Sequence, residues 1–358
     1  MRILVEILHP AHVHFFRHFI AEMESRGHQL LVTSRDKDVA LALLDAYRIP
    51  HRVLSAQKKG ALGLAGELLN RTRALLPMID EFRPDVLTGI MGPTIALAGK
   101  WKDVPTVVFY DTEAAWLTNS WVYRLADAVC TPDSYPGTVP GRHLTYPGYH
   151  DLAYLRPGRF TPEPDKLRHF GLDASRPFTL ARFVSFEASH DLRDRGLSRE
   201  GKVALLAHLA QYGDVVVSTE GPLPQGLPAK PLTGPAHEVH HVLAAARLVV
   251  GDSGTMSSEA AVLGTPAVFV STARLGVLLD LEHRYGLMTN VLPVDPAVAI
   301  AAASRLLLEA ESGSIEQGRQ QLLAETVDVT SWMVDFFEDA AERAWYGWRG
   351  GAGARGRP

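Results

Sequence analysis

Short apolar runs alternate along the chain with longer segments in which apolar residues recur at helical spacing. This order of elements is typical of parallel sheets whose strands are joined by crossover helices. In the first part, strands are expected at 2–8, 28–34, 85–90, 106–111 and 127–132, and helices near 37–47, 62–82 and 117–126. A further helix is expected from His12 to Arg26, with Gly27 in the position of a C-cap.

A second series of elements follows the stretch YPGYHDLAYLRPGRFTPEPDKL, which is rich in proline and glycine and lacks periodicity. We expect this stretch to be an interdomain linker. Beyond it, strands are expected at 178–184, 214–220, 246–252 and 266–271, and helices near 199–211, 237–245, 255–263, 275–285 and 295–310.

The pattern therefore predicts an α/β fold with two Rossmann-like parallel-sheet domains that face a central cleft. The expected domains are residues 1–150 and 165–328, because a chain of 358 residues is too long for one ordinary core. A C-terminal helix over 329–348 could return to the N-terminal domain. The Gly/Arg-rich residues 349–358 are expected to be a disordered tail.

Composition narrows the possible functions. The formal net charge of -4 gives no basic field for nucleic acid. The single cysteine, Cys130, excludes an intramolecular disulfide and a cysteine-based zinc cluster, and it fits a reducing compartment. No window reaches the roughly 18 apolar residues of a membrane span, so a cytoplasmic protein is expected. The basic stretch SAQKKGALG could touch an acceptor or the inner face of the membrane, although an ordinary amphipathic helix explains it better.

Ligands of open α/β sheets bind beyond the carboxyl ends of strands, so the residues that follow each strand carry the most information. No G-x-G-x-x-G follows the first strand, which argues against a dinucleotide site. Ser253, Gly254 and Thr255 follow a strand and open a helix, and a helix N-terminus with hydroxyls is suited to a diphosphate. Glu259 could accept hydrogen bonds from a sugar diol. A capping box is the alternative, and it fits only partly because Met256 stands three residues before Glu259.

Two further strand ends carry polar residues. Asp111 and Glu113 form a pair that could divide acid and base roles, although N-capping explains Asp111 alone equally well. Arg182, Ser185 and His190 follow the first strand of the second domain and suit an anionic ligand.

The stretch LHPAHVHFFRHF places several histidines just after the first strand. His14 and His18 have i,i+4 spacing, but no neighbouring Glu or third ligand completes a zincin-type site, so no metal site is predicted. Both are expected on the first helix, with His18 on its solvated surface. His9 and His12 are expected at the strand-to-helix turn, facing the cleft.

Longer motifs in the chain resemble those of an uncharacterised prokaryotic GT-B-like family that is catalogued as a domain of unknown function. They extend over nearly the full chain and comprise HPAHVHFFRHFI, TSRD, DTEAA with Asn119, YPGYHDLAYL, RFVSFEASHD, STEGPLP and GDSGTMSSEAAVLGTPA. The family name does not supply a reaction.

The peptidoglycan N-acetylglucosaminyltransferase is more distantly similar. Its nucleotide-binding segment resembles GDSGTMSSEAAVLGTPAVFV, which implies that Ser253, Gly254 and Thr255 meet diphosphate and Glu259 the ribose. Its acceptor-side segment resembles DTEAAWLTNSW, and His12 falls where its Gly-rich first turn ends in a histidine.

The non-hydrolysing UDP-N-acetylglucosamine 2-epimerases are also distantly similar. Glu113 resembles a catalytic Glu of those enzymes, and His190 lies roughly where they carry a functional His. Their catalytic Asp, however, is matched here by the turn Gly92-Pro93-Thr94.

These resemblances imply a metal-independent GT-B glycosyltransferase whose co-substrate is a nucleotide-diphosphate sugar, expected to be a UDP-sugar, and which needs no other cofactor. The donor would bind the second domain, and an unknown acceptor (lipid, glycan or small molecule) the first. Glu113 or His12 would remove the acceptor proton, Asp111 is a further catalytic candidate, and Arg182 would hold diphosphate. A UDP-sugar 2-epimerase-like enzyme and a non-catalytic nucleotide-sugar-binding protein are the alternatives.

Overall fold

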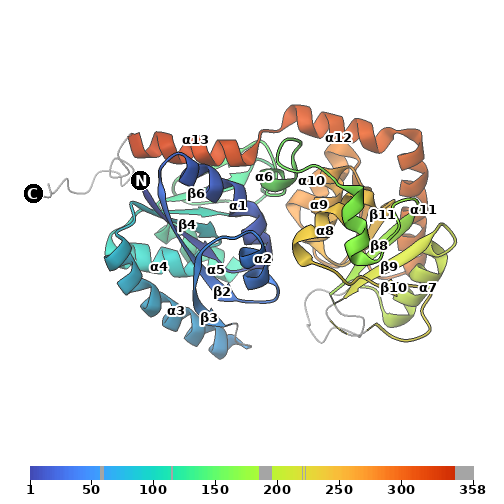
Figure 1. The fold of residues 1–358 in the computed structure, drawn as a ribbon, viewed down its shortest axis with the longest axis horizontal. Helices are drawn as coiled ribbons and strands as arrows, with labels where there is room; N and C mark the ends of the chain where they lie inside the picture. Colours follow the sequence, from blue (N-terminus) through green and yellow to red (C-terminus); the bar gives the residue numbers. More distant parts are fainter. Residues whose placement is uncertain (57–59, 114–115, 185–195, 220, 222, 343–358) are drawn as a thin grey trace, which may run out of the picture. The chain divides into compact units, whose positions relative to one another are not determined.

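Two parallel sheets organise the computed structural model, one in each of two units (Figure 1). The first unit comprises Met1–Tyr154 and Val327–Pro358, and the second comprises Leu155–Thr326. The structure describes all residues except 57–59, 114–115, 185–195, 220, 222 and 343–358, so the predicted tail lies outside the described residues. The predicted α/β class with two parallel-sheet domains is confirmed.

The sheet of the first unit has the strand order β3-β2-β1-β4-β5-β6-β7, and its paired strands are parallel. The strands are β1 (Arg2–Ile7), β2 (Gln29–Asp36), β3 (His51–Ala56), β4 (Val86–Ile90), β5 (Thr106–Phe109), β6 (Ala128–Pro132) and β7 (His143–Tyr146). The strands β4, β5 and β6 are buried at every residue. Their short, mainly apolar sequences are typical of strands covered on both faces.

Helices cover both faces of this sheet, as the alternation along β5 shows. Val108 belongs to the core shared with α3 (Ala61–Phe82) and α4 (Pro93–Lys102), whereas the ring of Phe109 lies 5.2 Å from Phe15 of α1 (Pro10–Ser25). Helix α13 (Val329–Glu342) packs against α1, where the Phe19 and Phe337 rings are 5.0 Å apart. The unit also contains α2 (Ala40–Ala46), α5 (Trp116–Leu125) and the start of α6 (Leu152–Leu155).

The sheet of the second unit has the order β10-β9-β8-β11-β12-β13, again with parallel pairs. Its strands are β8 (Phe178–Phe183), β9 (Asp214–Thr219), β10 (Lys230–Pro231), β11 (Leu248–Gly251), β12 (Ala267–Val270) and β13 (Met288–Val291). Its helices are η1 (Pro164–Phe170), α7 (Arg199–Leu209), η2 (Ala236–Glu238), α8 (Val239–Ala245), α9 (Gly254–Leu263), α10 (Gly276–Tyr285), α11 (Pro296–Ser312) and α12 (Ser314–Glu325).

Several elements were missed by the sequence pattern. The strands β7, β10 and β13 are short, and β3 is exposed or half-buried along its length, so none of the four has a continuous apolar run. Helix α4 begins with Pro93 after Gly92, a pair that signals a turn, and α12 is mostly polar. These elements form because neighbours in the fold cover them, which local periodicity does not report.

The stretch predicted as a linker is not one, because its residues up to Tyr154 belong to the first unit and those from Leu155 belong to the second, where Leu167 of η1 is 1% exposed. The side chains of Tyr146, Tyr149 and Tyr154 are at most 2% exposed, and Tyr146 lies 4.9 Å from the Trp332 ring of α13. Proline and glycine suggested a linker, but the buried aromatic rings anchor this segment in the first unit.

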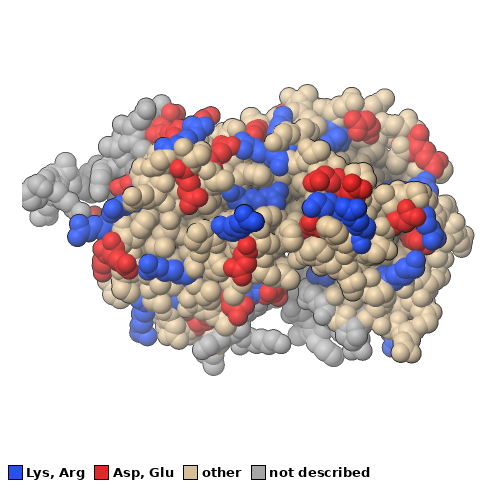
Figure 2. All heavy atoms as spheres, viewed as in Figure 1, with Lys and Arg blue, Asp and Glu red and all other residues tan. Residues whose placement is uncertain are grey.

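Charged side chains of both signs are interspersed over the face shown in Figure 2, in line with the small net charge. Among the described residues, no helix is both long enough and apolar enough to cross a membrane.

Gly251 lets the ends of β8 and β11 approach closely. It has a φ of +155°, and an added Cβ would lie 1.8 Å from the carbonyl oxygen of Arg182 on the paired strand. A backbone oxygen in a paired strand cannot move aside cheaply, so only glycine fits. The approach places Arg182 beside the turn that begins at Asp252.

We expect Gly251→Ala to lower the free energy of unfolding by about 2–5 kcal/mol, from overpacking and an unfavourable backbone conformation together. Gly286→Ala is the matched control, since Gly286 also has a positive φ (+64°) but no atom within 4 Å of an added Cβ. The control should lose only about 1–2 kcal/mol. Equal losses in denaturant unfolding would contradict the role assigned to the contact.

Candidate functional site

In the first unit, the structure brings together His9, His12, Asp111 and His150, which we call the His–Asp cluster. His9 and His12 follow β1, Asp111 follows β5, and His150 follows β7. The centroids of the His9 and His12 rings are 6.0 Å apart, and His150 Nδ1 lies 3.3 Å from Asp111 Oδ2. The electrostatic influence of Asp111 and His150 reaches His12. The cluster therefore forms at the carboxyl ends of the strands, where ligands of parallel sheets bind.

His9 and His12 have defined backbone partners. His9 is the N-cap of α1, and its Nδ1 accepts a hydrogen bond from the backbone N–H of Ala11 at 3.2 Å. His12 Nδ1 accepts from the N–H of Leu8 at 3.3 Å. Burial lowers the pKa of His9 to about 4 and lowers the pKa of His12 well below its usual value. Both rings are therefore neutral near pH 7.

The hydrogen bond from Leu8 argues against the prediction from the sequence that His12 acts as the base. Its Nδ1 lone pair is used by Leu8, so the neutral ring carries its proton on Nε2. In that state the imidazole offers an N–H donor rather than a free lone pair. His12 is better suited to donate a hydrogen bond than to remove a proton.

Asp111 remains ionised in the cluster. Burial alone raises the pKa of this carboxyl, but interaction with His150 outweighs burial and lowers the pKa below its usual value. The side chain of Asp111 is 39% exposed, whereas that of His150 is 8% exposed. The exposed carboxylate can therefore meet a ligand while the buried imidazole holds it in place.

His150 was missed by sequence reasoning. Its motif, YPGYHDLAYL, was assigned to the linker, and the signal that could have corrected this was its density of aromatic residues. His150 packs against Phe15, with ring centroids 4.3 Å apart, and its Nε2 is buried without a hydrogen-bond partner among the described residues.

The other two histidines of α1, His14 and His18, do not belong to the His–Asp cluster. His14 is buried, stacks on Tyr154 and contacts the Tyr47 hydroxyl through Nδ1 at 3.2 Å. His18 is half-buried rather than fully solvated, and its Nε2 accepts a hydrogen bond from Arg17 Nε at 3.2 Å. Within the described part of the chain, no group of three or more His, Cys, Asp or Glu side chains could hold a metal ion.

Glu113 opens on a separate pocket of about 310 Å³ in the first unit. The pocket is also lined by Asn119 and Arg124 of α5 and by Tyr123 and Tyr135, whose hydroxyls are 2.6 Å apart. Asn119 is 5% exposed, and its Oδ1 has no hydrogen-bond partner among the described residues. The pocket thus combines a carboxylate with a buried acceptor oxygen, which suits a ligand that supplies hydroxyl or amine donors.

In the second unit, α9 begins directly after the buried strand β11. Ser253 is its N-cap and accepts a hydrogen bond from the N–H of Met256 at 3.4 Å, so the hydroxyl has an ordinary capping role. Thr255 is exposed, and the first turn contains no acidic residue. The backbone N–H groups at this helix end are suited to a phosphate.

The structure contradicts the prediction that the Glu259 carboxylate is open to a ribose. This residue lies in the second turn of α9, is 4% exposed, and places Oε1 3.0 Å from His240 Nε2 of the neighbouring helix α8. Its observed role is to join the two helices, and it does not present an open carboxylate to a ribose.

Arg182 and Asp252 lie at the adjoining ends of β8 and β11. Arg182 donates to Ser218 Oγ at 3.4 Å, and Asp252 accepts from the N–H of Val184 at 2.7 Å. The ammonium group of Lys202, which is 4% exposed, lies 3.9 Å from Asp252. Lys202 and Asp252 were not proposed from the sequence. Ser185 and His190, which were, lie outside the described residues.

Comparison with known proteins finds a family that matches the first part of the chain. Residues 1–137 match the family described as "Protein of unknown function (DUF354)". The match covers the motifs HPAHVHFFRHFI, TSRD and DTEAA and confirms the stated resemblance for this part of the chain. No curated protein matches the sequence.

Solved structures share the fold over nearly the whole chain. The spinosyn forosaminyltransferase SpnP has a TM-score of 0.66 at 12% identity, covering 96% of this chain and 99% of that one. MurG of Acinetobacter baumannii has a TM-score of 0.58 at 15% identity, covering 95% and 100%. The UDP-GlcNAc 2-epimerase of Methanocaldococcus jannaschii has a TM-score of 0.66 at 12% identity, covering 86% and 93%. At identities this low, these structural similarities establish the shared fold alone.

The low pKa of His9 has a consequence for stability. As pH falls below 6.5, the unfolded chain takes up a proton at this position before the folded chain does, so stability is lost between pH 6.5 and about 4. His9→Asn keeps a side-chain acceptor at the N-cap and removes the titrating group. Measured by denaturant unfolding, the variant should match the wild type near pH 7.5 and lose less stability on acidification, by at most about 1.4 kcal/mol per pH unit. Parallel stability profiles for the two proteins would contradict this.

Proposed function

We propose that this chain is a GT-B-type glycosyltransferase that moves a sugar from a nucleotide-diphosphate sugar, a UDP-sugar, to an acceptor hydroxyl. The observation that carries the proposal is the start of α9, whose first turn contains no acidic residue and lies at the carboxyl end of β11. The fold adds support, because similar structures include a named forosaminyltransferase and an epimerase solved with UDP-GlcNAc and UDP.

The donor diphosphate would bind at the adjoining ends of β8 and β11. The N–H groups of Gly254 and Thr255 and the guanidinium of Arg182 would meet its negative charge, so transfer would need no metal ion. The negative charge of Asp252 beside the diphosphate would be offset by the Val184 N–H, which donates to it at 2.7 Å, and by the Lys202 ammonium at 3.9 Å. In this proposal, Glu259 supports the site by joining α8 to α9.

The acceptor would bind in the Glu113 pocket of the first unit. Glu113 would remove the hydroxyl proton, and Asn119 Oδ1 would accept a hydrogen bond from a neighbouring hydroxyl or amine of the acceptor. Asp111, which His150 orients, lies two residues before Glu113. Its carboxylate would stabilise the positive charge that develops on the sugar.

An epimerase is less well supported. The turn where the resembling epimerases carry a catalytic Asp is here Gly92-Pro93, and an added Cβ on Gly92 would lie 2.7 Å from Val108. The turn therefore leaves no room for a side chain at Gly92 and supplies no carboxylate. Conversion of UDP-GlcNAc alone, with solvent deuterium at C2, would favour the epimerase instead.

Donor binding provides the first test. We expect calorimetry to detect a UDP-sugar, and Arg182→Gln to weaken its binding by about 1.5–3 kcal/mol, the range for hydrogen bonds to charged groups. Arg176→Gln is the matched control, because Arg176 is an exposed arginine of the same unit, paired with Asp214. Failure of the folded wild-type chain to bind any nucleotide sugar would overturn the proposal.

Turnover provides the second test. With cell extract as the acceptor source, Glu113→Gln should slow release of UDP about 100-fold or more while leaving UDP-sugar affinity unchanged, because it removes only the base. Glu81→Gln, at an exposed glutamate of the same unit, should leave both unchanged. Unaltered turnover in Glu113→Gln would assign the base to another residue, and the absence of turnover in the wild type would favour a binding protein.

A further inference from the structure

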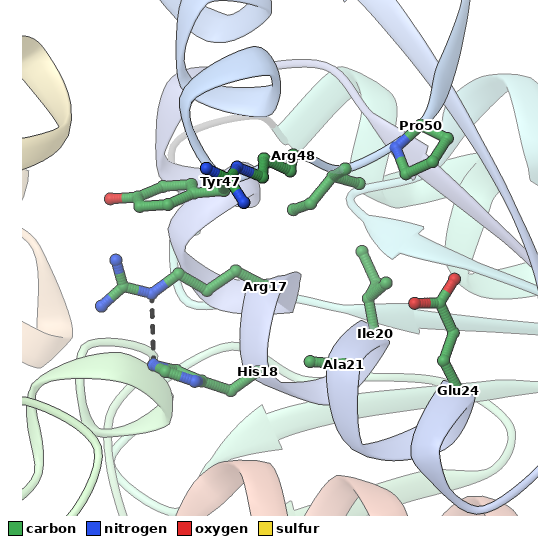
Figure 3. Close-up of a pocket in the computed structure, with 9 residues that line it drawn as sticks. Arg17, His18, Ile20, Ala21, Glu24, Tyr47, Arg48 and Pro50 are labelled. Atoms are coloured by element: carbon green, nitrogen blue, oxygen red, sulfur yellow. Dashed lines mark hydrogen bonds between the residues drawn. The ribbon is translucent and has the colours of Figure 1, made fainter.

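A second pocket of the first unit, with a volume of about 410 Å³, belongs to none of the sites described above. It lies between α1 and the segment that joins α2 to β3 (Figure 3). Its walls carry Arg17, His18 and Arg48 together with apolar side chains, of which Ile20 and Ile49 are buried.

Arg17 is held in a fixed position. Its guanidinium lies 4.8 Å from the centre of the Tyr47 ring, and it donates hydrogen bonds to His18 Nε2 and, at 3.4 Å, to the carbonyl oxygen of Tyr154. Among the described residues it forms no ion pair with Asp or Glu. Its remaining N–H groups and its charge are therefore available to a ligand.

Arg48 adds a second guanidinium to the same pocket. Its side chain is exposed, and it too forms no ion pair within the described part of the chain. Figure 3 places Glu24 at the end of the pocket opposite Arg17 and Tyr47, with Ile20 and Ala21 between. The pocket is thus basic at one end, apolar in the middle and acidic at the other.

We propose that this pocket binds a phosphomonoester whose phosphate lies between Arg17 and Arg48. A phosphomonoester carries a charge of about −1.5 to −2 at pH 7, which matches two guanidinium groups. The volume lies within the range of about 300–1,000 Å³ that is usual for small-molecule sites, so the ligand carries a body beyond its phosphate. That body covers the apolar middle, and Glu24 disfavours a second anionic group at the far end.

The phosphomonoester can come from a free phosphorylated metabolite or from the headgroup of a lipid such as phosphatidic acid. Both present the same group to the arginines. The inference does not rest on the proposed sugar transfer, because no residue of this pocket belongs to the donor or acceptor site.

The test uses the full chain and two probes with the same headgroup chemistry. Glycerol 3-phosphate is titrated by calorimetry, and sedimentation measures binding to phosphatidylcholine vesicles with and without phosphatidic acid. Arg48→Gln should weaken binding to the recognised probe about tenfold. Arg83→Gln is the matched control, since both arginines are exposed, have positive φ values (56° and 50°) and lose the same charge, but Arg83 lies outside the pocket.

Two further variants sharpen the result. Glu24→Gln should strengthen binding by removing repulsion, and Arg17→Lys should weaken it while keeping the charge, because an ammonium lacks the planar fork of a guanidinium. Binding of glycerol 3-phosphate identifies a free metabolite as the source, and binding only to phosphatidic acid vesicles identifies a membrane surface. The proposal is overturned if the wild type binds neither probe or if Arg48→Gln and Arg83→Gln lose affinity equally.

Discussion

The constraint on which this structure depends is that parallel strands all end at the same edge of their sheet. In the first unit this rule gathers residues that are distant in the sequence, such as His12 after β1, Asp111 after β5 and His150 after β7. In the second unit it places Arg182 of β8 beside the turn after β11. The close approach at Gly251 lies at this edge of the second sheet, at the last residue of β11.

A network of buried charged side chains connects the first sheet to α3. Glu6 lies in β1 at 1% exposure, and burial raises the pKa of its carboxyl. Arg71 of α3 faces it at 3.5 Å and also contacts Glu67 at 3.1 Å, while Glu67 pairs with Arg35 of β2 at 2.7 Å. A carboxylate without such partners would be costly in this core. The network therefore links the ends of β1 and β2 to one helix and fixes the helix relative to the sheet.

The candidate site could be predicted in part. Asp111, Glu113 and the α9 turn were found because each directly follows an apolar strand, and strand ends are visible in the sequence. His150 was not, since its segment has no periodicity and is held by the packing of Tyr146, Tyr149 and Phe15. The roles of His12 and Glu259 also changed in the structure, because their partners Leu8 N–H and His240 are set by backbone geometry and helix packing.

By itself, the sequence determined the fold class, the main strands and helices, and the two polar strand ends with the clearest chemistry. Those features depend on local periodicity and on the rule that strands of one sheet share an edge. Only the tertiary structure decided which edge strands and polar helices exist, where the first unit ends, and which buried groups are paired. Such outcomes depend on contacts between distant residues, since burial and hydrogen-bond partners set both the pKa of a side chain and its freedom to meet a ligand.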